Sequence, residues 1–157
     1  MATYETIQKE RRDRARTALE GYRAFCEMHE SYLKLMQDGD SRLLSMTAQM
    51  GETIASGAAG DAIGSGLAKL ETTSAKLRYV DDRICAKLDI LAHLVERVIE
   101  INPAAGRVLN KYYIAPYDDA PTFGDIARDL GYSIDRVYAL HLVGLDIVAN
   151  LLEVNKF

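Results

Sequence analysis

Two long stripes of apolar residues at helical spacing constrain this chain more than any other feature. In the segment Tyr4–Met36 the stripe recurs at alternating steps of four and three residues, as Ala15, Leu19, Tyr22, Cys26, His29, Leu33 and Met36. The segment from about Gly66 to Ile101 carries a second stripe of Leu70, Leu77, Ile84, Leu88, Leu91, Val95 and Val98. Helices with such stripes need a partner in water. The sequence therefore predicts an all-α fold that begins with a helical hairpin or coiled-coil-like region, paired within one chain or between two chains.

Charged residues surround both stripes. The basic stretch Arg11–Arg16 is interleaved with acidic residues one helical turn away, so we interpret it as a solvated face rather than as a DNA or phosphate contact. Asp81 is expected on the outer face of the second helix. His29 belongs to the first stripe, and we expect it to be a core or partly buried histidine rather than a ligand.

Two breaks divide this region. Residues 37–41 contain Gly39 between two aspartates and predict a turn with Ser41 as the cap of a short helix over about Leu43–Ile54. Residues 56–66 are rich in glycine and small residues, which is typical of a flexible connector. A phosphate-binding P-loop is not expected there, because Leu67 stands where that motif requires lysine.

The Asn102-Pro103 pair ends the second long helix and begins another. We therefore divide the chain into an assembly region, residues 1–101, and a second domain, residues 102–157. In this second domain we expect a helix over Pro103–Ile114 and an irregular loop over Ala115–Pro121. A helix opening at Thr122 with a capping box to Asp125 should end at Leu130, and a last helix should run from Ile134 to about Glu153.

Between the last two helices, Gly131-Tyr132-Ser133 has the composition of a tight turn followed by a helix cap. A short helix, a glycine-led turn and a Ser-capped helix make up the layout of a helix-turn-helix. The inward-facing residues are predicted to be Ile126, Ala127, Leu130, Val137 and Leu140. The exposed residues at the start of the last helix are predicted to be Ile134, Asp135, Tyr138 and Ala139. A small helical bundle contains the same pattern, so spacing alone leaves both interpretations open.

The domain over residues 102–157 resembles the fourth conserved region of sigma-70 family factors, aligning without gaps from Arg107 through Leu145. It is similar in more detail to phage and prophage late-transcription regulators of the ArpU/RinA type. The matching motifs are Tyr113-Ile114, Ile126-Ala127, Leu130-Gly131-Tyr132-Ser133 and Val137-Tyr138. The resemblance covers about a third of the chain; over residues 1–101 only the charged helical layout is shared.

The resemblance implies a transcriptional regulator in the cytoplasm of a bacterial host, with duplex DNA and RNA polymerase as partners. Carried over by position, the base-facing set is Ile134, Asp135, Tyr138 and Ala139, and the phosphate contacts are Arg128, Arg136 and Lys111. The sigma module has Arg, Glu, Arg and Gln at the four base-facing positions, and only Asp135 keeps the character. We therefore do not expect readout of a sigma-type promoter element.

Charge limits how such a module could bind DNA. The whole chain has a formal net charge of -4, which excludes a generally polybasic nucleic-acid coat. From Glu100 to Phe157 there are eight acidic residues against five basic ones. Because non-specific affinity for DNA depends on the number of phosphates neutralised, one such module would bind weakly. DNA binding thus implies a homo-oligomer formed through the long helices, or recruitment by polymerase.

Two other functions remain open: a helical adaptor that binds RNA polymerase or another phage protein, and a small terminase-like packaging protein. An enzyme is not expected, because His29, His93 and His141 lie far apart and no nucleophile–base spacing is present. No cofactor or metal site is expected from the spacing of His and Cys. Cys26 and Cys85 are expected to be buried reduced thiols. We expect no membrane span and no secretory signal.

Overall fold

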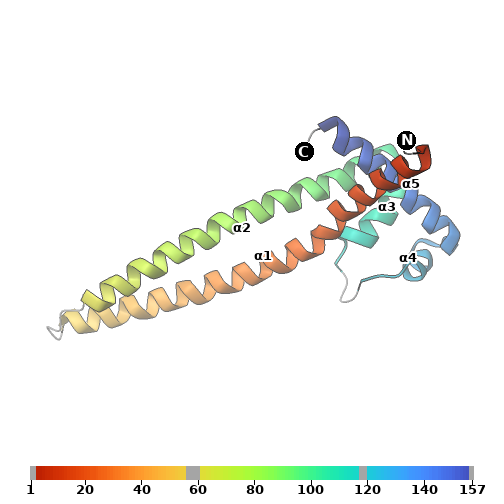
Figure 1. The fold of residues 1–157 in the computed structure, drawn as a ribbon. Coiled ribbons are helices and arrows are strands. Elements are labelled where there is room, and N and C mark those ends of the chain that lie inside the picture. Colours follow the sequence, from red (N-terminus) through yellow and green to blue (C-terminus); the bar gives the residue numbers. More distant parts are fainter. Residues whose placement is uncertain (1–2, 56–60, 117–119, 156–157) are drawn as a thin grey trace. The chain divides into compact units, whose positions relative to one another are not determined.

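The computed structural model describes residues 3–55, 61–116 and 120–155. These residues are all-α, as expected, and contain no strand. The order is α1 (Tyr4–Ala55), α2 (Asp61–Ile101), α3 (Pro103–Leu109), the π-helical turn η1 (Asn110–Ile114), α4 (Phe123–Leu130) and α5 (Ile134–Asn155), as Figure 1 shows.

The chain forms two compact units. The first consists of residues 1–25 and 88–157, and the second of residues 26–87. The boundary predicted between Ile101 and Asn102 falls inside the first unit. The reason is that the start of α1 and the end of α2 bury apolar side chains in one core with α3, η1 and α5. This core contains Ala15, Leu19, Val95, Val98, Ala105, Leu109, Tyr113, Leu145, Val148 and Ala149.

In the second unit, α1 and α2 run antiparallel, with His29 against Asp81 and Gly39 against Ser74. The turn predicted at residues 37–41 is wrong, because α1 continues through it without interruption. The short helix expected at about Leu43–Ile54 is likewise part of α1. One glycine costs a helix only about 1 kcal/mol. A Cβ on Gly39 would lie 3.3 Å from the Ser74 hydroxyl, so this glycine marks a close approach of α2 rather than a chain reversal.

Part of the connector predicted over residues 56–66 is helical. Helix α2 begins at Asp61, so residues 61–66 are helical despite Gly64 and Gly66. Glycine and other small residues weaken a helix but do not prevent one. The first turns of α2 are stabilised because the same helix continues into a packed pair. Residues 56–60 lie outside the described residues.

The stripes of α1 and α2 are less buried in the second unit than expected. Both cysteines are reduced thiols, as expected, but only partly buried, which corrects the expectation of buried side chains. Leu33 is 39% exposed, whereas Asp81, expected outside, is 7% exposed. The described residues 26–55 and 61–87 form a pair of helices without a third layer, so much of each stripe stays at the edge of the contact.

The helix boundary predicted at Asn102-Pro103, between α2 and α3, is confirmed in detail. The Asn102 side chain accepts a hydrogen bond of 3.1 Å from the Ala105 amide, and Pro103 occupies the first turn of α3. The predicted single helix Pro103–Ile114 is wrong in its second half, where η1 has π-helical bonding. The Ala115 amide donates to the Asn110 carbonyl at 2.7 Å, five residues back. This wider turn places Tyr113 in the core.

Helix α5 is long and apolar enough, by length and composition alone, to cross a membrane, with a mean hydropathy of 1.6 over Ile134–Val154. The core helix of a globular protein passes the same test. Here Leu145 and Val148 are fully buried, and Asp146 forms an ion pair with Arg12. Helix α5 is therefore packed through one face against the core of the first unit.

Gly106 tests how tightly α3 is packed. A Cβ at this position would lie 2.5 Å from the Cα of Ile99, which is backbone and cannot rotate away. We expect Gly106→Ala to lower the free energy of unfolding by about 1–3 kcal/mol, the usual cost of overpacking. Urea denaturation followed by circular dichroism measures the change.

Gly124→Ala is the matched control, since its Cβ would make only an ordinary contact of 3.5 Å with the Thr122 hydroxyl. Alanine also favours the helix, so this variant should be neutral or stabilised. Equal stability of the two variants would contradict the close packing of α3 against Ile99.

Candidate nucleic-acid interface

The first element of the candidate interface is α4, whose start is fixed by a complete capping box. The Thr122 hydroxyl accepts a hydrogen bond from the Asp125 amide at 3.2 Å, and the Asp125 carboxylate accepts one from the Thr122 amide at 3.0 Å. Hydrogen bonds from Thr122 hold the pKa of Asp125 below its ordinary value. The predicted capping box is therefore confirmed, and it keeps a carboxylate at the positive end of the helix.

The turn between α4 and α5 has the predicted cap geometry at both ends. Gly131 has φ +66°, a left-handed conformation that glycine adopts without strain. The Tyr132 amide donates to the Ala127 carbonyl at 2.9 Å, which closes α4. At the start of α5 the Ser133 hydroxyl accepts a hydrogen bond of 3.2 Å from the Arg136 amide. The entry angle of α5 is thus fixed by local chemistry.

A small core joins the two helices below the turn. Val108, Ile126 and Val137 are fully buried and Ala127 nearly so. The inward orientation predicted for α4 and α5 is confirmed, with Leu130 and Leu140 partly buried against this cluster. Helices α4 and α5 are therefore packed against α3 as well as against each other.

The four residues predicted to face DNA bases, Ile134, Asp135, Tyr138 and Ala139, are all exposed. Ile134 is 57% exposed and Tyr138 54% exposed. They occupy the first two turns of α5, the part of a recognition helix that reaches base edges. Their exposure is an observation, and their contact with DNA stays a prediction.

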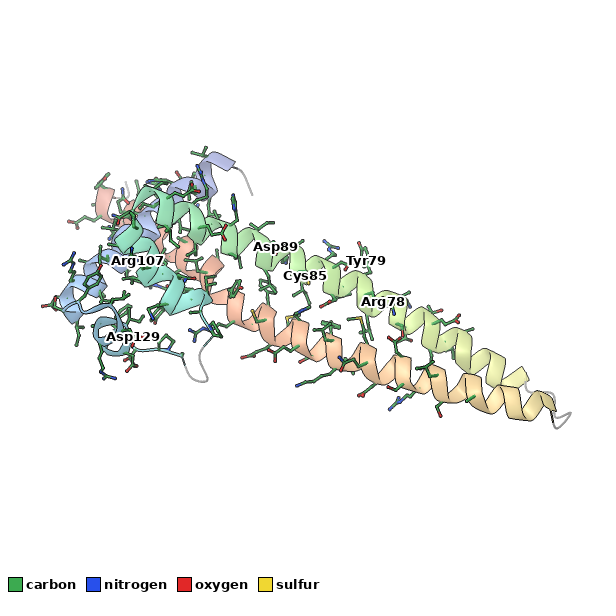
Figure 2. The ribbon with its side chains drawn as sticks, turned by 180° about the vertical axis from the view of Figure 1, so that it is seen from behind. Arg78, Tyr79, Cys85, Asp89, Arg107 and Asp129 are labelled. Atoms are coloured by element: carbon green, nitrogen blue, oxygen red, sulfur yellow. The ribbon has the colours of Figure 1, made fainter. Side chains whose placement is uncertain are left out.

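The three predicted phosphate contacts differ in how free their charges are. Arg128 is 80% exposed and lies 3.5 Å from the Asp125 carboxylate. The Arg136 guanidinium stacks over the Tyr132 ring at 4.4 Å, which orients it beside the turn. Lys111 is half-buried and forms an ion pair of 3.0 Å with Asp129, a residue labelled in Figure 2. Lys111 is therefore the most restrained of the three.

Sequence reasoning missed a set of contacts between α1 and α5. Both oxygens of Asp146 accept hydrogen bonds from Arg12, at 2.6 and 2.7 Å, and this contact raises the pKa of the Arg12 guanidinium. Arg11 binds both oxygens of Glu153 at 2.7 Å. The interpretation of Arg11–Arg16 as a solvated face with local partners is wrong for these two residues. Their acidic partners lie more than 130 positions away, where no local pattern can reveal them.

Beside these ion pairs lies an open hollow of about 440 Å³ between α1 and α5. Tyr138 and Leu142 form its wall on α5. On α1 it is lined by three basic and two acidic side chains, Lys9, Arg12, Arg16, Glu5 and Asp13. Side chains of both charges therefore border the exposed start of α5.

Aromatic rings support α5 from within. His141, 3% exposed, shares a hydrogen bond of 2.9 Å with the Tyr113 hydroxyl. Its ring also lies within 5.3 Å of Tyr112 and 5.1 Å of Phe123, centroid to centroid. Burial lowers the pKa of His141 to about 4 and raises the pKa of Tyr113. At neutral pH His141 is thus an uncharged core residue.

This buried histidine makes a pH dependence of stability testable. An unfolded chain carries His141 with a pKa near 6.5, so it binds more protons than the folded chain between pH 6.5 and 4. Stability is then highest above pH 6.5 and falls as the pH drops through this window. We expect a loss on the order of 1–2 kcal/mol between pH 7 and pH 5. Urea unfolding at both pH values measures it.

The variant His141→Gln should lose most of this dependence, whereas His93→Gln should keep it, because His93 is exposed. Parallel pH profiles for His141→Gln and the unmodified protein would show that another group is responsible.

Comparison of the chain with protein-family models, with curated proteins and with solved structures gave no match. The resemblance to sigma-type and phage regulators therefore rests on the motifs quoted above.

Proposed function

We propose that this protein is a DNA-binding transcriptional regulator of phage type that reads duplex DNA with the start of α5. One observation carries the proposal. At the N-terminal end of α5 four side chains are exposed, and the Ser133 cap before them fixes where the helix begins. These side chains are Ile134, Asp135, Tyr138 and Ala139. A rigidly held helix end with exposed side chains is what entry into a major groove requires.

Phosphate contacts flank this end in the proposed complex. Arg128 lies at the end of α4 and Arg136 in the first turn of α5, on either side of the Gly131–Ser133 turn. Contacts of this type position a protein on DNA without reading its sequence. Lys111 contributes less, because Asp129 already binds its ammonium group.

The acidic net charge of residues 100–157 alone disfavours DNA binding. The ion pairs between α1 and α5 offset part of this charge and so favour the proposal. Residues 1–25 carry six basic and four acidic side chains and belong to the same compact unit as α5. Arg11 and Arg12 neutralise Glu153 and Asp146, which would otherwise repel phosphates. Lys9 adds an exposed cation beside Tyr138.

Self-assembly is the second part of the proposal, because one module with few cations binds DNA weakly. In the second unit several large apolar side chains are exposed: Met28, Leu33, Leu35, Leu44, Tyr79 and Val80. In the proposed assembly a second chain would cover some of these side chains. Two copies would bring two α5 ends to one duplex and multiply their phosphate contacts.

The double variant Arg128→Ala/Arg136→Ala tests the phosphate contacts. Each phosphate contact contributes about 0.9 to the slope of log affinity against log salt, so we expect the slope to fall by roughly 2 per chain. Fluorescence anisotropy with a labelled duplex measures this slope over salt concentrations from ~0.05 to ~0.2 M, a range of about fourfold. Sedimentation of the same samples gives the number of chains per duplex.

Arg83→Ala/Arg97→Ala is the control, since it removes the same net charge from α2. It should leave the slope nearly unchanged. If the unmodified protein does not bind duplex DNA at the lowest salt, the DNA-binding function is wrong and the polymerase-binding adaptor becomes the better hypothesis.

Tyr138→Ala tests base reading separately. Sequences are first selected from random duplexes with the unmodified protein, and affinities for selected and scrambled duplexes are then compared. We expect Tyr138→Ala to lose discrimination between the two duplexes by about tenfold while keeping the salt slope, because a base contact carries specificity and little charge. Val143→Ala, an exposed α5 residue more than two turns from the start of the helix, is the control. Unchanged discrimination in Tyr138→Ala would remove this residue from the proposed base-facing set.

A further inference from the structure

A histidine, a carboxylate and a thiol meet between α1 and α2 in the second unit. His29 Nδ1 lies 2.7 Å from an Asp81 carboxylate oxygen and 3.6 Å from the Cys85 sulfur. One ligand atom from each of the three residues lies within 4.8 Å of the other two. Figure 2 labels Cys85 on α2. The proposed DNA function uses none of these residues.

Helix geometry explains why the three side chains converge. Asp81 and Cys85 are four residues apart, so they project from the same face of α2 one turn from each other. His29 belongs to the stripe of α1 that faces α2, and the antiparallel pairing sets it opposite both. Two helices thus bring three possible metal-ligand atoms together without the help of a loop.

The buried carboxylate is the unusual member of this cluster. Asp81 is 7% exposed, and among the described residues no lysine or arginine forms an ion pair with it. A buried carboxylate requires a compensating positive charge or hydrogen bonds. His29 supplies one contact. A cation bound at the same place would compensate the charge fully.

The donor types and spacing fit one class of cation. Imidazole nitrogen, carboxylate oxygen and thiolate sulfur are the ligands of Zn²⁺, which binds them tetrahedrally. Bonds of about 2.0 Å to nitrogen and 2.3 Å to sulfur separate those two ligands by roughly 3.5 Å at a tetrahedral angle. The observed distance of 3.6 Å between His29 Nδ1 and Cys85 Sγ already matches. The Asp81 oxygen, now 2.7 Å from His29 Nδ1, would exchange its hydrogen bond for a metal bond by moving to roughly 3.3 Å from this nitrogen.

We propose that His29, Asp81 and Cys85 bind a divalent metal ion of the zinc type and clamp α1 to α2. Cys85 binds as the thiolate and releases its proton, while Asp81 binds through a carboxylate oxygen. Three protein ligands leave a fourth position for water. The clamp joins residues 52 and 56 positions apart, in a unit where much of the helix stripe is only partly buried.

Metal titration of the full chain, purified without a histidine tag, tests the proposal. Co²⁺ serves as the spectroscopic probe, because a thiolate ligand gives a sulfur-to-cobalt charge-transfer band and tetrahedral geometry gives intense visible bands. We expect one Co²⁺ per chain, displaced by Zn²⁺, and a higher melting temperature with Zn²⁺ present. Absence of both the band and the shift would overturn the proposal, leaving only a His29–Asp81 hydrogen bond.

Variants show which side chains bind. Cys85→Ser should abolish the charge-transfer band, and Asp81→Asn should weaken Zn²⁺ binding by at least about tenfold. Cys26→Ser is the matched control, because Cys26 lies on α1 outside the cluster and should leave the band unchanged. Circular dichroism verifies that each variant is folded. Binding of Co²⁺ with equal affinity by the unmodified protein and Cys85→Ser would identify adventitious surface binding and reject the site.

Discussion

Helix α5 is stable only where other helices cover its apolar side. Its buried residues Leu145 and Val148 pack in one core with Leu19 of α1 and with Val95 and Val98 of α2. Helices as short as α3 and α4 are not stable alone in water, so this shared core is what allows residues 102–155 to fold. The ends of the two long helices, residues 1–25 and 88–101, are therefore part of the unit that carries the candidate interface, whereas residues 26–87 form the second unit.

The shared core also explains which part of α5 is left exposed. The residues that α1 and α2 bury lie in the second half of α5, while α4 and α3 hold its first turns through Val137. Ile134 and Tyr138 belong to neither cluster and remain more than half exposed, although the Tyr138 ring makes an edge contact with Phe123. Single exposed apolar side chains are common on protein surfaces, so this exposure permits a binding role without by itself assigning one.

Features encoded within a few residues could be predicted from the sequence. The caps at Asn102, Thr122 and Ser133 and the left-handed Gly131 each depend on neighbours less than one helical turn away. Predictions were wrong, or were not made at all, for features that depend on distant segments. Gly39 predicts a turn by local rules, but in the structure it allows close packing against Ser74 of α2. Asp81 is expected in solvent by local rules, because its partner His29 lies 52 positions away. The exposure of the candidate base-facing residues was predictable from helical spacing, whereas their ligand is not encoded in spacing at all.

Charge is where local and distant information combine most directly. The domain predicted from local signals is acidic, and on its own this argues against contact with DNA. Two of its acids, Asp146 and Glu153, are neutralised by Arg12 and Arg11 of the same compact unit. A partly shielded ion pair contributes little to stability, so its main effect here is on the electrostatic field that an approaching phosphate meets. These two acids lie beyond the first two turns of α5, whereas Asp135 lies in its first turn, inside the candidate base-facing set. In the proposed complex a carboxylate at that position would accept hydrogen bonds from cytosine amino groups and would repel phosphate, so for this residue the proposal favours a base contact over a backbone contact.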